Sequence, residues 1–211
     1  MAVSEYSYRT LREQVRVRFT VNNSRFIATA APVSSLEAAE QFVEQVRAEF
    51  PDATHHAYAY RVGAGTSLVE RAFDDREPAG TAGLPMLQLL QGEGLSDLVV
   101  VATRYFGGIK LGIGGLTRAY RQCARACLEA AVLVERERLC YCRMVVSYGV
   151  IGALLRQLEA VGAEIMATDY AADVSVIAAI PCRLAEAMRK KFVELSRGRG
   201  RWEELAEPPA V

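Results

Sequence analysis

The chain has 211 residues, 51% of them hydrophobic, and its 25 basic and 25 acidic residues give a formal net charge of zero at pH 7. That length and apolar content can bury a core in one large domain or two small ones. No apolar run approaches the length of a membrane span, and residues 1–18 lack the apolar stretch of a signal peptide, so we expect a cytoplasmic protein with no membrane partner. Bulk charge does not require nucleic acid as a partner.

The first part of the chain predicts a sheet with helices. Residues 16–20 and 25–31 predict a β-hairpin around Asn22 and Asn23, and Ser34 is placed as the N-cap of a helix over residues 35–50. Two more strands are expected at 54–62 and 67–73. A polar loop at 74–83, a short helix to about Leu90, a buried strand at 97–102 and a long helix at 116–134 then follow.

Charged residues at 135–138 interrupt the apolar pattern, and a simpler order follows them. We expect a strand to Tyr148, a helix at 151–161, strands at 164–168 and 173–180, a helix at 181–195 and a last strand near Trp202. The order β-α-β-β-α-β is typical of a ferredoxin-like domain. The prediction is therefore an α+β chain with domains at 1–134 and 135–211.

A glycine-rich loop between the buried strand and the long helix is the most informative segment. Its glycines are Gly107, Gly108, Gly112, Gly114 and Gly115. Such a loop directs free backbone N–H groups and the positive end of a helix dipole toward one spot, which suits an anion such as phosphate. Residues 99–125 carry five basic side chains and no acid: Arg104, Lys110, Arg118, Arg121 and Arg125.

Two alternatives accompany this interpretation. The loop can instead be a tight structural turn that lets strand and helix pack closely, and the arginines can be an ordinary solvated helix face. Standard nucleotide motifs also fail, because Lys110 is not followed by Ser or Thr in a Walker A frame and Thr117 stands where a third dinucleotide-motif glycine would be. We therefore expect no cofactor.

Basic residues also gather in the second part of the chain. Residues 183–201 hold seven of them against two glutamates: Arg183, Arg189, Lys190, Lys191, Arg197, Arg199 and Arg201. The five cysteines show no repeated pair spacing, and Cys123 and Cys127 fall on the apolar stripe of the long helix. Structural thiols in a reducing compartment explain the cysteines better than zinc or disulfides.

A rival chemistry is suggested by an acidic loop and a histidine. Asp74, Asp75 and Glu77 lie within one loop, and His56 is one of only two histidines. These residues are candidates for acid–base catalysis, with ordinary turn and core roles as the alternative. His55 and His56 are adjacent on a predicted strand, so their side chains point to opposite faces and only one imidazole could bind a given metal ion. One imidazole with carboxylates is a weak indication of a metal site, and none is predicted.

Four motifs in this order resemble the IMPACT/YigZ family: residues 23–27, 55–59, 74–83 and 104–115. The resemblance covers residues 16–131, and the second domain looks like the small domain that follows in bacterial members. It implies a two-layer α/β first domain similar to the second domain of small-subunit ribosomal protein five, and a second domain similar to ferredoxin-like domains of elongation factor G. Eukaryotic members act as regulators of translation through protein partners. One departure is Arg76, which stands where the family's acidic loop usually has glycine.

The leading hypothesis is a non-enzymatic protein that binds RNA or the ribosome and regulates translation. The expected phosphate- or RNA-binding residues are Arg25, Arg104, Tyr105, Gly107, Gly108, Lys110, Gly112, Gly114, Gly115 and Arg118. The alternatives are a phosphate-directed hydrolase or transferase that uses Asp74, Asp75, Glu77 and His56, and a protein-interaction module.

Overall fold

The computed structural model describes residues 6–63 and 67–205 and has the predicted α+β fold class. The described residues fall into two compact units. The first covers Tyr8–Arg136, and the second covers residues 137–205 together with residues 6 and 7. None of the described helices is both long and apolar enough to cross a membrane.

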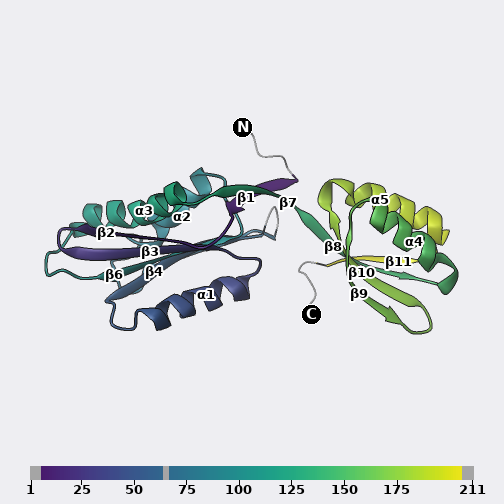
Figure 1. Ribbon diagram of the computed structural model, residues 1–211, viewed down its shortest axis with the longest axis horizontal. Coiled ribbons are helices and arrows are strands. Elements are labelled where there is room, and N and C mark those ends of the chain that lie inside the picture. The colour runs from purple at the N-terminus through teal and green to yellow at the C-terminus, as the bar shows by residue number, and fades with distance from the viewer. Residues whose placement is uncertain (1–5, 64–66, 206–211) are drawn as a thin grey trace. The chain divides into compact units, whose positions relative to one another are not determined.

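A five-stranded antiparallel sheet with the order β2-β3-β6-β4-β5 forms the centre of the first unit. Its strands are β2 (Val15–Val21), β3 (Ser24–Pro32), β4 (His55–Val62), β5 (Val69–Phe73) and β6 (Leu98–Tyr105). Helix α1 (Leu36–Glu49) covers one face, and α2 (Gly83–Gly92) with α3 (Gly112–Ala130) covers the other (Figure 1). Separately, β1 (Ser7–Leu11) pairs with β7 (Leu133–Glu137).

The central strands are apolar on both faces, which explains why helices pack on both sides. Along β6, Val99 and Val101 join the core beneath α1, whereas Val100 and Ala102 join the core beneath α2 and α3. Successive strand residues point to opposite faces, so one apolar run serves two cores. Helix α1 thus adds a third layer to the predicted two-layer arrangement.

The second unit has the predicted element order. It contains β8 (Leu139–Val146), α4 (Tyr148–Ala160), β9 (Glu164–Tyr170), β10 (Val174–Pro181), α5 (Cys182–Ser196) and β11 (Arg201–Leu205). Its antiparallel sheet has the order β11-β8-β10-β9. Buried residues of β8 and β10 form one core with Leu154, Leu158, Met188 and Phe192 of the two helices.

Several element boundaries differ from the prediction. Strands β1 and β7 were not expected, and the interrupting charges at 135–137 lie on β7 with exposed side chains. Helix α3 begins at Gly112 rather than at residue 116, so three glycines of the expected loop form its first turn. Ser35, not Ser34, caps α1, because its side-chain oxygen accepts the Ala38 N–H.

The expectation of five structural thiols is wrong for one pair, since Cys140 and Cys182 form a disulfide. These residues are 42 positions apart, but the pairing of β8 with β10 places Leu139 opposite Pro181 and so brings the two cysteines together. Spacing along the chain could not reveal that register. The other three, Cys123, Cys127 and Cys142, are buried free thiols.

Candidate functional site

The four motif segments meet at one end of the five-stranded sheet. Strand pairing places Arg25 of β3 beside Tyr105 of β6, and His55 of β4 beside Arg104 of β6. The backbone N–H of Phe106 donates to Thr54 Oγ1 at 3.0 Å. The four segments, residues 23–27, 55–59, 74–83 and 104–115, therefore lie together at one end of the three central strands.

The β2–β3 turn and the glycine loop lie in direct contact. Asn22 and Asn23 have φ values of 43° and 63°, as two-residue hairpin turns require. A Cβ atom on Gly107 would lie 2.1 Å from the backbone carbon and oxygen of Asn23. Glycine is thus required at residue 107, because any side chain would push the loop off the turn.

The outer part of the loop is open to solvent. Three large apolar side chains there are unusually exposed: Phe106 by 46%, Ile109 by 49% and Ile113 by 71%. Helix α3 starts at Gly112 with no side-chain cap and no acidic residue in its first turn. Its first N–H groups and the positive end of its dipole consequently face solvent, which is the arrangement that binds anions.

Two cations accompany this helix start. Lys110 and Arg118 are exposed, and no ion pair found among the described residues involves either of them. The Arg118 guanidinium folds back over the first turn, because its Nη1 lies 3.4 Å from the position of a Cβ on Gly114. The Arg118 guanidinium and the first amides of α3 thus lie in the same small region, and Lys110 precedes the helix by two residues.

Arg25 and Tyr105 form a neighbouring surface pair. The Arg25 guanidinium carbon lies 4.2 Å from the centre of the Tyr105 ring, within cation–π distance. The Tyr105 hydroxyl donates to Asp52 at 2.8 Å, which fixes the ring. This pair is a planar, positively charged platform beside the loop.

Arg104 does not belong to this surface, contrary to the prediction. Its side chain is 4% exposed, and its guanidinium donates to Glu77 at 2.6 Å and to Ser24 Oγ at 3.0 Å. The alternation along β6 explains this position, since Arg104 continues the row of Val100 and Ala102 that faces α3. Arg104 supports the loop from beneath and does not face a ligand.

Each carboxylate of the acidic loop is occupied by the fold. Asp74 accepts the backbone N–H groups of residues 80, 82 and 83 at 2.8–2.9 Å, and Asp75 accepts the N–H of His56 at 2.6 Å. Glu77, only 4% exposed, accepts from Arg104 and from the Tyr120 hydroxyl at 2.7 Å. Burial, and then the Glu77 charge, raise the pKa of Tyr120. These residues hold the loop in place.

Arg76 shows how the loop accommodates a residue where glycine is usual. Its φ of 69° is in the left-handed region, and the preceding Asp75 has a φ of 45°. The Arg76 guanidinium donates to the Thr54 carbonyl at 3.0 Å. The side chain therefore offsets part of the backbone strain with a hydrogen bond.

His56 does not face the acidic side chains as the catalytic alternative requires. Its Nε2 lies 3.1 Å from the Phe50 carbonyl and its Nδ1 lies 3.1 Å from Thr103 Oγ1. Burial lowers the pKa of His56, so the imidazole is a neutral core group. The neighbouring His55 faces the loop instead, with Nε2 3.7 Å from Glu77. In the described parts of the chain, no three His, Cys, Asp or Glu side chains are arranged to hold a metal ion.

The basic stretch at 183–201 is largely neutralised by neighbouring acids. Four of its seven cations are in ion pairs: Arg183 with Glu137, Arg189 with Glu204, Lys190 with Glu186 and Lys191 with Glu194. The charges are therefore of mixed sign, and the stretch offers much less positive potential than its sequence suggested.

Sequence reasoning missed the structural role of Glu77 and the exposed apolar residues Phe106, Ile109 and Ile113. The apolar residues had a signal, because they interrupt a glycine-rich loop in which a purely structural turn would be polar. The Glu77 contacts join residues 43 and 27 positions apart, so no local pattern contains them.

Comparisons with known proteins match both units. Residues 22–128 match the model of the Impact N-terminal domain, and residues 144–199 match a domain of unknown function (DUF1949). The chain is 37% identical over 179 residues to IMPACT family member YigZ of Escherichia coli, covering 84% of this chain and 88% of that protein. It is 32% identical over 194 residues to IMPACT family member YvyE of Bacillus subtilis, and the match covers 92% of this chain and 89% of that protein. A crystal structure of a hypothetical protein has a TM-score of 0.74 at 34% identity and covers 95% and 98% of the two chains.

Proposed function

The chain belongs to the IMPACT family, and on that premise we propose that it is a cytoplasmic, non-enzymatic regulator of translation that binds RNA or the ribosome. Eukaryotic members of the family regulate translation, which supports the process. The proposed contact surface is the glycine loop with the start of α3. Its ligand groups are phosphates of single-stranded RNA.

One observation carries this proposal: the exposed start of α3, which has no side-chain cap, lies beside Lys110 and Arg118, and neither cation has an ion-pair partner within residues 6–63 and 67–205. The backbone N–H groups of Gly112, Ile113 and Gly114, the first three helical residues, supply donors of fixed direction, and Lys110 and Arg118 supply charge. The N–H of Gly115 is not among them, because the fourth residue of a helix donates to the carbonyl of the N-cap residue. Phosphate contacts of this kind position a nucleic acid without reading its sequence. Arg104 is not among the proposed phosphate contacts, because its side chain is buried against Glu77.

Aromatic surface next to the phosphate site favours unpaired RNA over duplex. The Tyr105 ring with its Arg25 partner, and the half-exposed Phe106 ring, lie within a few residues of the loop. Unstacked bases stack on such rings regardless of their identity. We therefore expect weak sequence preference and strong dependence on salt.

The test compares two double variants on the same helix. Lys110→Ala/Arg118→Ala removes the cations at the loop, and Arg121→Ala/Arg125→Ala removes the same charge from exposed positions farther along α3. Fluorescence anisotropy with a labelled single-stranded RNA should show about tenfold weaker binding for the first variant, and a salt slope reduced by roughly 0.7 per lost contact. The second variant should change affinity much less.

Co-sedimentation with ribosomes, with and without nuclease, separates RNA contact from protein contact. The proposal fails if the wild-type chain binds neither ribosomes nor RNA at low salt, or if both double variants lose affinity equally. Association that survives nuclease and both variants would support a protein-interaction module instead. No second function is proposed for the acidic loop, because hydrogen bonds within the fold occupy its carboxylates.

A further inference from the structure

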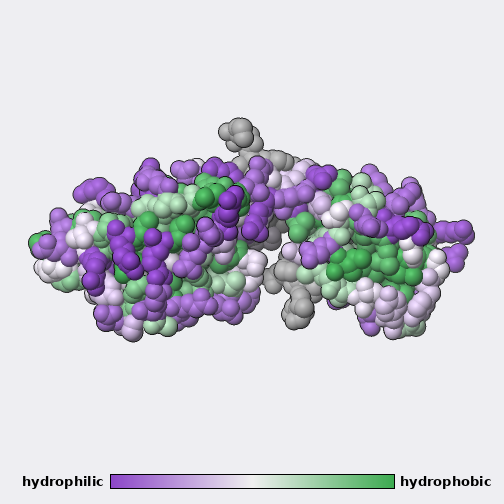
Figure 2. Space-filling model, viewed as in Figure 1, coloured by the Kyte–Doolittle hydropathy of each residue, from purple (hydrophilic) through white to green (hydrophobic). Residues whose placement is uncertain are grey.

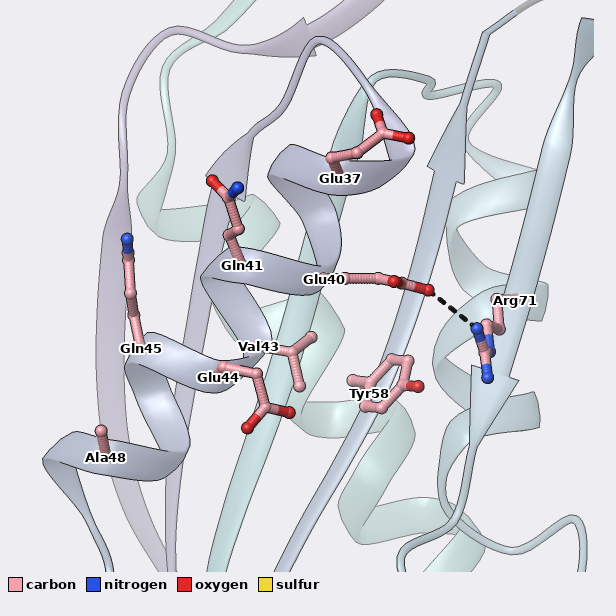
Figure 3. Close-up of a pocket in the computed structure, with 9 residues that line it drawn as sticks. All are labelled: Glu37, Glu40, Gln41, Val43, Glu44, Gln45, Ala48, Tyr58 and Arg71. Carbon is pink, nitrogen blue, oxygen red and sulfur yellow. Dashed lines mark hydrogen bonds and ion pairs between the residues drawn. The ribbon is translucent and has the colours of Figure 1, made fainter.

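Many charged side chains of the two units are neutralised by their neighbours. In the groove between α1 and the sheet of the first unit, Glu40 reaches toward Arg71 and pairs with it at 2.9 Å (Figure 3), and Glu44 pairs with Arg47 at 2.6 Å. Four cations of α5 in the second unit are paired in the same way. These groups are therefore not available to a partner as free charges.

The turn between α5 and β11 is different. Residues 197–201 read Arg-Gly-Arg-Gly-Arg, and all three arginines of this arginine turn are exposed. Within residues 6–63 and 67–205, no ion pair or side-chain hydrogen bond involves Arg197, Arg199 or Arg201. The nearest glutamates along the chain are each paired with another cation: Glu194 with Lys191, Glu203 with Arg143 and Glu204 with Arg189. The turn thus carries three unpaired positive charges, and Figure 2 shows hydrophilic side chains at this end of the unit.

The backbone of the arginine turn is fixed on α5. The Arg199 N–H donates to the Ser196 carbonyl at 3.0 Å. A Cβ atom on Gly200 would lie 2.5 Å from the Phe192 ring and 2.9 Å from Ser196 Cβ, so glycine allows the turn to pack on the helix. Directly after the turn, the Trp202 ring centre lies 5.4 Å from that of Phe192. The arginine side chains therefore extend from a backbone of defined position.

Arg197 occupies a backbone conformation that favours glycine. It ends α5 with φ 52° and ψ 39°, in the left-handed region where helices commonly end at a glycine. Arg76 has a similar conformation, but its guanidinium donates to the Thr54 carbonyl. The Arg197 side chain forms no hydrogen bond or ion pair within the described residues. Backbone strain that a side chain does not offset within the fold is typical of functional positions.

The charges of the second unit are separated between the two edges of its sheet. Three exposed acids lie on β9 or in the turn after it, and none has an ion-pair partner among the described residues: Glu164, Asp169 and Asp173. Strands β9 and β11 are opposite edges in the order β11-β8-β10-β9. A negatively charged polymer is therefore repelled by the β9 edge and attracted to the arginine turn.

Phosphate is the group that fits this surface. A guanidinium presents planar pairs of N–H donors that match phosphate oxygens. Residues 197–201 contain only arginine and glycine, so the turn lacks the large apolar or aromatic side chain around which protein interfaces and membrane-inserting segments are built. The neighbouring Trp202 packs into the core of the unit and is not a platform for a base. The surface therefore suits a phosphate backbone without base recognition.

We propose that Arg197, Arg199 and Arg201 bind the phosphate backbone of RNA, as a contact separate from the glycine loop. Segments rich in arginine and glycine bind single-stranded nucleic acid by charge, with little sequence preference. The choice of RNA among phosphate polymers rests on the proposed function. The site itself depends only on residues of the second unit.

The test uses the full chain with Lys110→Ala/Arg118→Ala, so that the glycine loop does not contribute, and a fluorescein-labelled oligouridine RNA. Arg197→Gln/Arg199→Gln/Arg201→Gln removes the unpaired charges, and Arg189→Gln/Lys190→Gln/Lys191→Gln removes the same charge from paired positions on α5. Anisotropy should show about tenfold weaker binding for the turn variant and a salt slope lower by about 2, since each single-strand phosphate contact contributes roughly 0.7. The α5 variant should stay within about threefold.

The same variants in the otherwise wild-type chain separate this inference from the proposed function. If the wild-type chain binds no RNA at low salt, both fail. If it binds RNA but the turn variant and the α5 variant behave alike, only the arginine turn is excluded. If the turn variant loses affinity and Lys110→Ala/Arg118→Ala does not, the arginine turn stands and the glycine loop is excluded.

Arg197→Gly distinguishes binding from a role in folding. It removes the left-handed strain, so the urea midpoint followed by Trp202 fluorescence should rise, while RNA binding weakens by about two- to threefold. A lower midpoint, or unchanged RNA affinity, would each overturn the role of this residue. Amide chemical-shift changes on addition of RNA are expected at residues 196–202. Changes confined to the first unit, or turn-dependent binding of polyglutamate or phosphatidylglycerol vesicles that is tighter than that of RNA, would overturn the proposal.

Discussion

Replacing Glu77 tests whether Arg104 supports the loop or faces a ligand. The variant Glu77→Gln removes the charge that the Arg104 guanidinium contacts at 2.6 Å, where both side chains are 4% exposed. Breaking a buried pair from one side leaves an uncompensated charge and costs about 3–5 kcal/mol. For a unit of this size that loss lowers the melting temperature by about 10 °C or more.

The assay uses the single tryptophan, Trp202, which lies in the second unit. Urea unfolding followed by far-UV circular dichroism should show the first unit unfolding earlier in Glu77→Gln, whereas the Trp202 fluorescence transition should stay in place. The double variant Glu77→Met/Arg104→Met should recover only part of the loss, because apolar groups replace the buried ion pair at little cost but leave the Tyr120 hydroxyl without its acceptor. A loss below about 0.5 kcal/mol in Glu77→Gln, the level of an ordinary surface change, would refute the reasoning.

Three further predictions use the same unfolding measurements. Gly107→Ala should destabilise the first unit by about 1–3 kcal/mol, because the new Cβ would lie 2.1 Å from backbone atoms of Asn23. Gly114→Ala should be neutral or stabilising, because its Cβ meets only the end of the flexible Arg118 side chain, at 3.4 Å. Equal effects of the two variants would contradict the packing of the loop on the turn. Cys182→Ser should lower the free energy of unfolding of the second unit, followed by Trp202 fluorescence, by up to about 4 kcal/mol, which is the loop-entropy value for a bridge between residues 42 apart. An unchanged free energy of unfolding in non-reducing buffer would contradict the disulfide. Burial lowers the pKa of His56 below its ordinary value of 6.5, so the unfolded chain binds the proton more readily than the folded chain. The contribution of His56 to the free energy of unfolding is therefore fully present above pH 6.5 and declines as the pH falls below it. His56→Gln should flatten the decline of the unfolding free energy between about pH 7.5 and 5.5, and an unaltered slope would exclude His56 as its source.

Local patterns in the sequence predicted most elements of the fold. Short runs of mostly apolar residues identified β3, β4 and β6, and the stripe containing Tyr120, Cys123 and Cys127 identified the buried face of α3. The βαββαβ order of the second unit was likewise predicted from pattern alone. Strand β1 escaped notice because it has no apolar run, and β7 because most of its residues are charged and exposed. The two strands pair with each other across more than 120 residues of sequence, so no local pattern links them.

The candidate site was only partly predictable. The position of the glycine loop and the exposure of Lys110 and Arg118 follow from spacing and helical periodicity. The burial of Arg104 does not, because a basic residue at a strand end ordinarily reaches solvent, and here a distant glutamate holds it inside. The histidine near the acidic loop is His55 and not His56. Strand alternation shows that the two side chains point to opposite faces, but it cannot show which face the loop at 74–83 covers.

The brace formed by Glu77, Arg104 and Tyr120 separates two tasks within one short region. Shape is set by groups that water does not reach, whereas the cations that we propose as partner contacts, Lys110 and Arg118, are exposed to water. Replacing an exposed cation leaves the scaffold intact, at a cost of a few tenths of a kcal/mol. If these cations bind RNA as proposed, substitutions at their positions would change affinity without altering the loop that carries them.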